Sequence, residues 1–504
     1  MNLTFCRPRA AALLLTLGAL GAAAQSGRME RATPESQGIS SAAVTAYFER
    51  LLDWPSAEIH SAVVVRHGRV VAELYPAPFK AEGAQTLYSV SKTFTAAAVG
   101  IAEAENRLRT TDRVAPYFTG QLPATVSAAL ADMTVRDLLT MQSGIHPDSQ
   151  LRTRTRDWTR TMLARNVAAP GTAFAYDSMC SYLLSCIVQK ATGRKLLDYL
   201  REKIFTPMDI GEAQWEESPE GYNTGGWGLR LTSESLAKCG QLWLDGGRWQ
   251  DRQLLPEGWT AEMMRLQTSA EAGYGYHMWP CPESPGAARM DGALGQYVFV
   301  VPEADLVVVL TQCCTSGLGE QRKLLWDILV PACGEKALRE GAELRALRRL
   351  EAEARLPWPA GAAAGPTSAQ LLLADRDFIL PANDLKWKSV RLHFASTGPT
   401  LTVKKTDGTS FAIAPGHRKW NEAVSTALPP YSIAPLDRFK GIERRFTIAS
   451  AYGWPAADEL AVDLHFTNWG SGVALTFKAA ADGVVTLSLR ENYAARTLRM
   501  TFRK

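Results

Sequence analysis

The 504-residue sequence has little excess of charge of either sign, few histidines and no long hydrophobic run in its main body. Lysine and arginine number 55 against 51 aspartates and glutamates, which leaves a formal net charge of +4 at pH 7. Binding to nucleic acid or to an anionic membrane surface requires concentrated positive charge. The near-neutral balance therefore argues against both as partners.

The scarcity of histidine and the spacing of cysteine argue against a metal centre. The sequence has 7 histidines and 8 cysteines, and no cysteines show the two-residue pairing with nearby histidines that zinc sites use. We therefore expect neither a metal nor a cofactor. Disulfides could form among Cys281, Cys313, Cys314 and Cys333, while the odd number of cysteines after Cys6 leaves at least one thiol free.

No membrane-spanning segment follows the N-terminus. Arg7 and Arg9 precede an apolar run over 10–21, and the small residues 22–24 follow it. This order of basic, apolar and small residues is typical of a cleaved signal peptide. The run is shorter than the ~20 residues of a spanning helix, so an uncleaved anchor is the less favoured alternative. We expect residues 1–24 to be removed on export to the periplasm or the cell exterior, with no membrane span afterwards.

One serine–lysine pair lies in a setting suited to nucleophilic catalysis. Ser89 and Lys92 stand three residues apart, just before an apolar run over 94–102 that predicts a buried helix. Residues three apart share a helix face, so the hydroxyl and the amine can meet. Burial lowers the pKa of a lysine toward the neutral amine, which can take the proton of a serine nucleophile.

A second pair, Ser235 and Lys238, has the same spacing and shows that the spacing alone is not specific. This copy lies among leucines that predict an ordinary packed helix. The first pair differs in context, because two predicted strands, 61–66 and 69–75, precede it around a tight turn. We therefore favour Ser89 as the nucleophile.

Two further motifs follow along the chain. The motif Tyr-Asp-Ser at 176–178 opens an apolar helix over 181–191, and its phenol could serve in proton transfer or belong to the core with its hydroxyl at the surface. A glycine-rich turn at 292–296 precedes two valine-rich strands, and backbone N–H groups there could bind an oxyanion. Between the Ser89 pair and the tyrosine motif, Thr134 and Asp137 predict a capped helix, which we interpret as packing in preference to a substrate loop.

The composition changes near residue 335. Helical and strand patterns are mixed over 30–335, where the aromatic segment 274–279 is strand-like. A charged helical pattern and a linker rich in proline and alanine occupy 336–368. Alternating apolar residues over 369–504 then predict an antiparallel sandwich or barrel without an obvious catalytic cluster.

Together these motifs resemble the serine β-lactamase and penicillin-binding-protein superfamily, above all class C-like members such as the 6-aminohexanoate oligomer hydrolases and related esterases. The resemblance covers 30–335 and depends on the order of the Ser89, Tyr176 and Gly292 motifs. It implies an α+β fold with an antiparallel sheet flanked by helices and an all-α subdomain. A C-terminal all-β domain after a linker also occurs in relatives of this kind.

The resemblance implies a role for each matching residue. Ser89 would form an acyl-enzyme, and Lys92 would act as its base or hold Tyr176 as phenolate. Tyr176 would carry the proton to the leaving group and later activate water. The backbone N–H groups of Ser89 and of Ala293, beside Gly292, would form the oxyanion hole.

Two departures from the family pattern bear on the substrate. Ser178 stands where the family has an asparagine that contacts the acyl side chain. The third motif, 290–292, lacks the lysine or histidine that would bind the carboxylate of a β-lactam or a D-alanyl peptide, and Arg289 could replace it only if directed into the site. These departures favour an exported serine hydrolase of small amides or esters over a β-lactamase or D-Ala-D-Ala carboxypeptidase.

Two other classes remain as alternatives. A Ser-His-Asp hydrolase is disfavoured because the sequence has no Gly-x-Ser-x-Gly motif and only His67 and His146 lie near the motifs. A non-turnover penicillin-binding sensor or scaffold would use the β domain for binding, but a sensor normally needs a membrane span. The sequence carries no signal for an oligomeric state.

Overall fold

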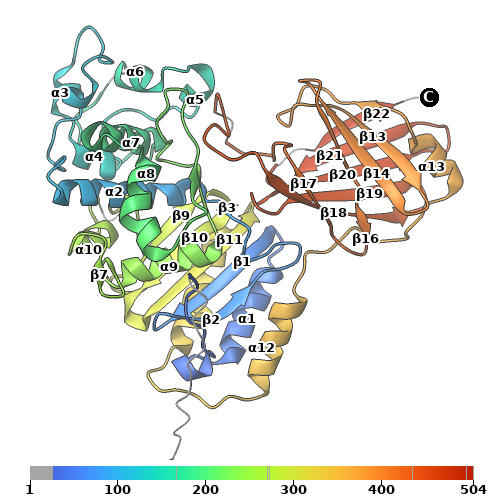
Figure 1. Cartoon of the computed structure of the whole chain (residues 1–504), viewed down its shortest axis with the longest axis horizontal. Helices are drawn as coiled ribbons and strands as arrows, with labels where there is room; N and C mark the ends of the chain where they lie inside the picture. The colour runs from blue at the N-terminus through green and yellow to red at the C-terminus, as the bar shows by residue number, and fades with distance from the viewer. Residues whose placement is uncertain are drawn as a thin grey trace, which may run out of the picture.

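The computed structural model describes residues 27–502, except 166, 270, 272, 434 and 495–496. The expected signal peptide, 1–24, lies outside the described residues. A region of mixed helices and strands occupies the first part of the chain, and an all-β region occupies the last part (Figure 1). This arrangement confirms the expected α+β fold with an all-β C-terminal part.

The first region is built on a six-stranded sheet in which all neighbouring strands are antiparallel. In spatial order its strands are β2 (Arg69–Leu74), β1 (Ala57–Arg66), β11 (Leu306–Cys314), β10 (Gln296–Val301), β9 (Ala288–Gly292) and β8 (Trp279–Pro280). Successive residues of a strand point to opposite faces. Val63 and Val65 of β1 accordingly join one buried cluster and Val64 joins another, so both faces of the sheet are covered.

Helices cover these two faces (Figure 1). On one face, α1 (Ser41–Leu52) packs against β1 and against α12 (Ala342–Glu353), whose Leu347 is buried in the same cluster. On the other face, α9 (Ser233–Leu244) lies on β10 and β11. None of the helices in the described part of the chain is long and apolar enough to span a membrane.

An all-α part gathers beyond one end of the sheet (Figure 1). Its helices are α2 (Ser91–Ala104), α3 (Ala128–Asp132), α4 (Val135–Leu139), α5 (Leu151–Arg154), α6 (Trp158–Leu163), α7 (Ser178–Thr192) and α8 (Leu196–Leu200). The predicted capping box is present, since Thr134 and Asp137 each accept from the other's backbone N–H at the start of α4. Asp177 caps the start of α7, and Gly193 ends it with a φ of 75° in the left-handed region.

The prediction of a strand over 274–279 is wrong for most of that segment. Only Trp279 and Pro280 pair with β9, as β8. His277 has a φ of 56°, and this left-handed conformation interrupts an extended backbone. The first region also contains five short strands and two further helices: β3 (Gln85–Thr86), β4 (Gln214–Trp215), β5 (Leu229–Leu231), β6 (Arg248–Trp249), β7 (Arg252–Gln253), α10 (Trp259–Met264) and α11 (Leu318–Leu324).

Two sheets form the C-terminal region, and their aromatic side chains meet between them. Phe378 and Phe477, one from each sheet, have ring centroids 5.4 Å apart, so the region is a sandwich. All strand pairs are antiparallel except β16–β18. The four-stranded sheet comprises β12 (Phe378–Ile379), β13 (Trp387–Ala395), β14 (Gly398–Lys405) and β15 (Ser410–Ile413); the seven-stranded sheet comprises β16 (Gly416–His417), β17 (Asn421–Ser425), β18 (Phe446–Ala456), β19 (Glu459–Phe466), β20 (Ser471–Ala479), β21 (Val485–Glu491) and β22 (Leu498–Phe502).

The cysteines in the described residues form no disulfide. Cys180, Cys186, Cys239, Cys281, Cys313, Cys314 and Cys333 are all free thiols. The bridges that the sequence allowed among the last four are therefore absent from the described part of the chain.

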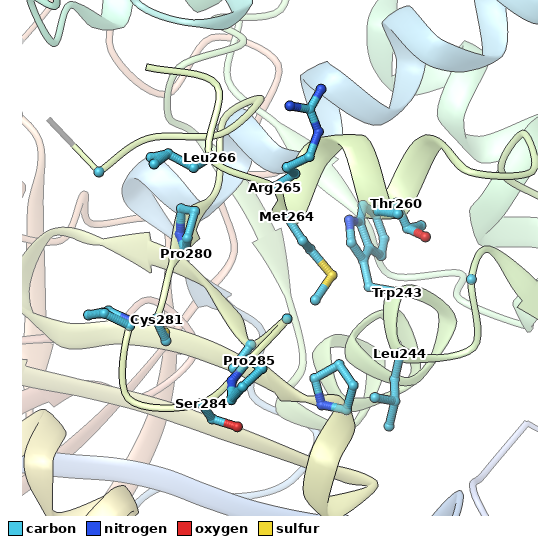
Figure 2. Close-up of a pocket in the computed structure, with 17 residues that line it drawn as sticks. Trp243, Leu244, Thr260, Met264, Arg265, Leu266, Pro280, Cys281, Ser284 and Pro285 are labelled. Carbon is cyan, nitrogen blue, oxygen red and sulfur yellow. The ribbon is translucent and has the colours of Figure 1, made fainter. Parts of the chain in front are cut away.

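A mostly apolar cavity of about 880 Å³ lies between α9, α10 and the segment that follows β8 (Figure 2). Trp243, Met264 and Pro285 are among its lining residues. Ser89, Lys92 and Tyr176 are not. The cavity is therefore separate from the predicted reactive residues.

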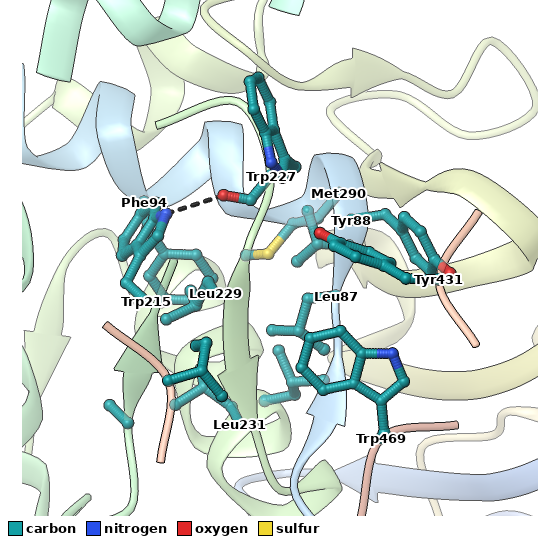
Figure 3. Close-up of a cluster of buried hydrophobic side chains, with 14 of the residues drawn as sticks. Leu87, Tyr88, Phe94, Trp215, Trp227, Leu229, Leu231, Met290, Tyr431 and Trp469 are labelled. Atoms are coloured by element: carbon teal, nitrogen blue, oxygen red, sulfur yellow. Dashed lines mark hydrogen bonds between the residues drawn. The ribbon is translucent and has the colours of Figure 1, made fainter. Parts of the chain in front are cut away.

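The C-terminal region is joined to the first region by a shared hydrophobic cluster (Figure 3). Tyr431 and Trp469 pack beside Leu87 and Tyr88, the two residues that precede Ser89 in the chain. A hydrogen bond reinforces the contact, because the backbone N–H of Thr86 donates to the carbonyl of Trp469 at 3.1 Å. The β region therefore adjoins the segment that carries the predicted nucleophile.

Packing along α2 leads to a stability prediction. A Cβ on Gly100 of α2 would lie 2.2 Å from the indole of Trp259. We expect Gly100→Ala to destabilise the protein by about 1–3 kcal/mol through overpacking. Gly319→Ala is the matched control, because this helical glycine faces open space and should leave stability unchanged or slightly raised. Thermal unfolding of the two variants measures the difference, and equal melting temperatures would contradict the prediction.

Candidate active site

Ser89 lies at a sharp turn between a short strand and the helix α2. It occupies the 3₁₀ turn Tyr88–Val90, which follows β3 and leads directly into Ser91, the first residue of α2. Tyr88 has a φ of 47°, an uncommon value for a bulky residue, and its side chain is buried. Backbone strain of this kind persists only where the surrounding packing holds it. Ser89 itself is partly exposed, so its hydroxyl is accessible beside a rigid core.

The Lys92 side chain reaches Ser89 from the first turn of α2. Its Nζ lies 2.8 Å from the Oγ of Ser89, 3.0 Å from the Oγ of Ser178 and 2.7 Å from the carbonyl oxygen of Gly226. The residue is only 1% exposed. The amine is therefore held by three oxygens, with the predicted nucleophile among them.

The pKa of Lys92 falls to about 7, chiefly because burial disfavours the charged ammonium. The negative charge of Asp177 opposes this shift, whereas the positive charge of Arg152 adds to it. A substantial fraction of the neutral amine is consequently present near neutral pH. This is the protonation state that can accept a proton from a serine hydroxyl.

The ring of Tyr176 lies beside the lysine, with its centroid 4.9 Å from the Nζ of Lys92. Burial raises the pKa of the Tyr176 phenol, and its contact with Ser89 only partly opposes the shift. The ring also stacks on Trp279 at a centroid distance of 5.8 Å. The raised pKa favours a neutral phenol, which can donate a proton, over the phenolate that was the alternative role for Tyr176 in the sequence analysis.

The turn after β9 comes close to the nucleophile from the opposite wall. Gly292 ends β9, and a Cβ there would lie 2.5 Å from the carbonyl oxygen of Leu87, two residues before Ser89. Only glycine permits this approach. Ala293 follows directly and is exposed. All six residues predicted for the site from the sequence, Ser89, Lys92, Tyr176, Ser178, Gly292 and Ala293, are thus gathered in one place.

The arginine of the third motif is bound to a neighbouring carboxylate. The Nε of Arg289 lies 2.8 Å from the Oδ2 of Asp291, and Arg322 lies 4.0 Å from the same oxygen. Its guanidinium also packs against the ring of Trp279, 5.7 Å from the centroid. Because its charge is already paired, Arg289 does not present a free cation in place of the missing lysine or histidine.

The second serine–lysine pair has a structural explanation. Ser235 donates to Glu212 at 2.6 Å, and Lys238 donates to the carbonyls of Met208 and Asp209 at 2.8 and 3.1 Å. The two side chains thus have separate partners and sit in the packed helix α9. The spacing was equal in both pairs, but only Lys92 hydrogen bonds to its serine.

Sequence reasoning missed a histidine next to the lysine. His277 is buried, its Nε2 lies 3.0 Å from the Oγ of Ser181, and its carbonyl accepts from the hydroxyl of Thr93 at 2.9 Å. Burial and then the charge of Lys92 lower the pKa of His277 to about 3, so the ring is neutral. The histidines that the sequence singled out, His67 and His146, are both exposed. Within the described residues, no cluster of three or more metal-ligand side chains is present.

A loop of the C-terminal region was also missed as part of the site's surroundings. Ser432 donates to the hydroxyl of Tyr88 at 3.1 Å. The carboxylate of Glu216 accepts from the hydroxyl of Tyr431 at 3.1 Å, from the N–H of Phe439 at 2.6 Å and from the indole of Trp227 at 2.9 Å. No local pattern predicts the contacts of Tyr431, Ser432 and Phe439, because their partners lie more than 200 positions away in the chain.

Comparisons with known proteins identify the family of this chain. A family model described as Beta-lactamase matches residues 28–326. The 6-aminohexanoate-dimer hydrolase of Paenarthrobacter ureafaciens is 26% identical over 280 residues, which cover 49% of this chain and 70% of that protein. Penicillin-binding protein 4 of Amycolatopsis lactamdurans is 26% identical over 300 residues, which cover 49% of this chain and 76% of that protein.

A solved structure shares the fold of the first region. It is a Bacillus anthracis protein assigned as a 6-aminohexanoate-dimer hydrolase, with a TM-score of 0.52 and 21% sequence identity over 60% of this chain and 86% of its own. The family match spans the sheet, the all-α part and the serine–lysine turn described above. On this match, the chain belongs to the β-lactamase family.

Proposed function

We propose that this protein is an exported serine hydrolase that cleaves small amides or esters through an acyl-enzyme on Ser89. The observation that carries the proposal is the 2.8 Å separation between the Nζ of Lys92 and the Oγ of Ser89, with the pKa of Lys92 lowered to about 7. A serine becomes a nucleophile when a neighbouring base takes its proton. Lys92 has the position and the protonation state for that task.

In the first step, the Oγ of Ser89 attacks the substrate carbonyl carbon as its proton passes to Lys92. The carbonyl oxygen becomes an oxyanion, which the backbone N–H groups of Ser89 and Ala293 would stabilise. The bond to the leaving amine or alcohol then breaks, and the phenol of Tyr176 donates its proton to that group. Lys92 returns the proton to Tyr176, which restores both side chains.

In the second step, a water molecule hydrolyses the acyl-enzyme. Lys92 and Tyr176 take a proton from the water, whose oxygen attacks the ester carbon. The bond to Ser89 breaks, the serine regains its proton and a carboxylic acid is released. Ser178 donates no proton in this scheme; it accepts from Lys92 at 3.0 Å and holds the amine in place.

Two observations support small amides or esters as the substrate class. The relative from Paenarthrobacter ureafaciens is a 6-aminohexanoate-dimer hydrolase at 26% identity. The third motif offers Asp291 and its paired Arg289 where a β-lactamase or D-Ala-D-Ala carboxypeptidase would use a free cation. Export rests on the basic, apolar and small residues of 1–24.

Substitution of the paired residues tests the mechanism. We expect Ser89→Ala to lower kcat/KM for p-nitrophenyl acetate by about 10³-fold or more, and Lys92→Ala by about 10²-fold or more, because the nucleophile or its base is lost. Ser235→Ala is the matched control and should keep full activity, since its hydroxyl bonds to Glu212. Labelling by a serine-directed fluorophosphonate should disappear only in Ser89→Ala. Loss of labelling in Ser235→Ala would contradict the assignment.

The pKa of Lys92 predicts a pH profile. The neutral amine is the active form, so kcat/KM should rise about tenfold per pH unit below 7 and level off above it. Asp177→Asn removes a negative charge that raises the pKa of Lys92, and this rising limb should move to lower pH. Asp157→Asn, at the exposed start of α6, is the control that should leave the limb in place. If the rising part of the kcat/KM profile stayed at the same pH in Asp177→Asn, this would argue against Lys92 as the titrating base.

The pairing of Arg289 with Asp291 predicts poor activity on β-lactams. We expect slow hydrolysis of nitrocefin, at least about 10²-fold below ester hydrolysis in kcat/KM, because the carboxylate beside the lactam nitrogen finds no free cation at the third motif. Rapid turnover of nitrocefin would instead support a β-lactamase. Stable acylation of Ser89 without turnover would support a penicillin-binding sensor.

A further inference from the structure

Arg152 is a half-buried cation without a hydrogen-bonded or ion-paired side-chain partner among the described residues. Its Nε is fully buried and makes no hydrogen bond. The neighbouring arginines are different, because Arg154 and Arg165 both pair with Asp148, and Arg156 pairs with Asp437. A buried charge without a partner is costly and points to a ligand that completes it.

The Arg152 guanidinium is held in place by its surroundings. The main chain of Arg152 is anchored, because its backbone carbonyl accepts from the backbone N–H of Leu436, in the loop of the C-terminal region, at 3.0 Å. The guanidinium carbon lies 5.2 Å from the centroid of the Trp227 ring. A guanidinium packed on an aromatic ring keeps the N–H groups at its edge available for a planar, bidentate acceptor.

Two nearby carboxylates have other tasks. Asp177 accepts from the N–H of Met179 at the start of α7, and Glu216 accepts from three donors of its own. Neither comes within ion-pair distance, 4.0 Å, of Arg152 among the described residues. Burial raises the pKa of Asp177, and it raises the pKa of Glu216 to about 7; both carboxylates act on Arg152 through space, but neither forms an ion pair with it.

Arg152 belongs to the wall of the site that holds Lys92. The Arg152 guanidinium packs on the ring of Trp227. Trp227 directly follows Gly226, whose carbonyl accepts from Lys92 at 2.7 Å. The charge of Arg152 also lowers the pKa of Lys92, in keeping with this placement. An anion bound to Arg152 would therefore lie beside the reacting serine.

The backbone of Leu87 separates this wall from the wall of the leaving group. Its N–H donates to the carbonyl of Leu229, two residues after Trp227, while its carbonyl faces Gly292 of β9. Tyr176, the proposed proton donor to the leaving group, stacks on Trp279 of β8, next to β9. The leaving group thus belongs on the side of β8 and β9, and the acyl group on the side of Trp227.

We propose that Arg152 binds a carboxylate carried by the acyl part of the substrate. The preferred substrates are then half-amides or half-esters of dicarboxylic acids, in which one carboxyl group is acylated and the other is free. This proposal rests on the acyl-enzyme function proposed above, because the acyl side is defined by attack of Ser89. It adds a substrate class that the paired Arg289 at the third motif does not predict.

The test compares matched charged and neutral esters. Mono-p-nitrophenyl esters of adipate to suberate carry a free acyl-side carboxylate, and their methyl esters do not. We expect the wild-type protein to prefer the charged series in kcat/KM, and Arg152→Gln to reduce this preference by about tenfold to a hundredfold. Arg152→Lys keeps the charge but not the bidentate geometry, so its preference should be intermediate. Arg154→Gln, on the same helix and already paired with Asp148, should leave the preference unchanged.

A second substrate pair tests whether Arg152 binds a carboxylate on the acyl part of the substrate or one on the leaving group. In 4-acetoxybenzoate and its methyl ester the carboxylate is on the leaving group, and no preference that depends on Arg152 is expected. No wild-type preference for the dicarboxylic esters, an unchanged preference in Arg152→Gln, or a preference on the leaving-group side would each overturn the proposal. Fluorophosphonate labelling reports whether Arg152→Gln is folded; if it is not, an unchanged preference in Arg152→Lys counts against the proposal. Turnover of the neutral esters by Ser89→Ala would instead refute the acyl-enzyme function itself.

Discussion

The site depends on the burial of one amine. Lys92 is 1% exposed and held by the oxygens of Ser89, Ser178 and Gly226, which come from three separate segments of the chain. Burial lowers its pKa to about 7, and hydrogen bonding fixes its position. Exposed to water, the same amine would stay protonated at neutral pH and could not act as a base. The packing of α2 and α7 therefore serves the chemistry as well as the stability.

The C-terminal sandwich packs around the segment that carries Ser89. The carboxylate of Glu216 joins Tyr431 and Phe439 of the sandwich to Trp227 of the first region. Ser432 reaches the hydroxyl of Tyr88, the residue before the nucleophile. Burial raises the pKa of Glu216 to about 7, so this junction lies in a strongly desolvated environment. The sandwich thus forms part of the framework around the serine turn, although it supplies none of the reacting groups in the proposed mechanism.

Much of the fold follows from patterns that local physical chemistry explains. The runs of valine in β1, β10 and β11 and the capping box at Thr134 and Asp137 appear in the structure near their predicted positions. The segment 274–279 does not, because a left-handed residue, His277, breaks the extended backbone that its aromatic content predicts. Aromatic composition reports a preference for burial in a sheet, but it does not specify the backbone conformation that tertiary packing imposes.

The sequence by itself determined the serine–lysine spacing, the helix that carries it and the order of the motifs, because these depend on neighbours a few residues apart. It did not distinguish Ser89–Lys92 from Ser235–Lys238 by spacing. Only the tertiary structure decided that one lysine meets its serine while the other bonds to the carbonyls of Met208 and Asp209. The same holds for Arg152, whose setting is made by Trp227 and Leu436. Contacts between distant segments arise from packing, which no local pattern encodes.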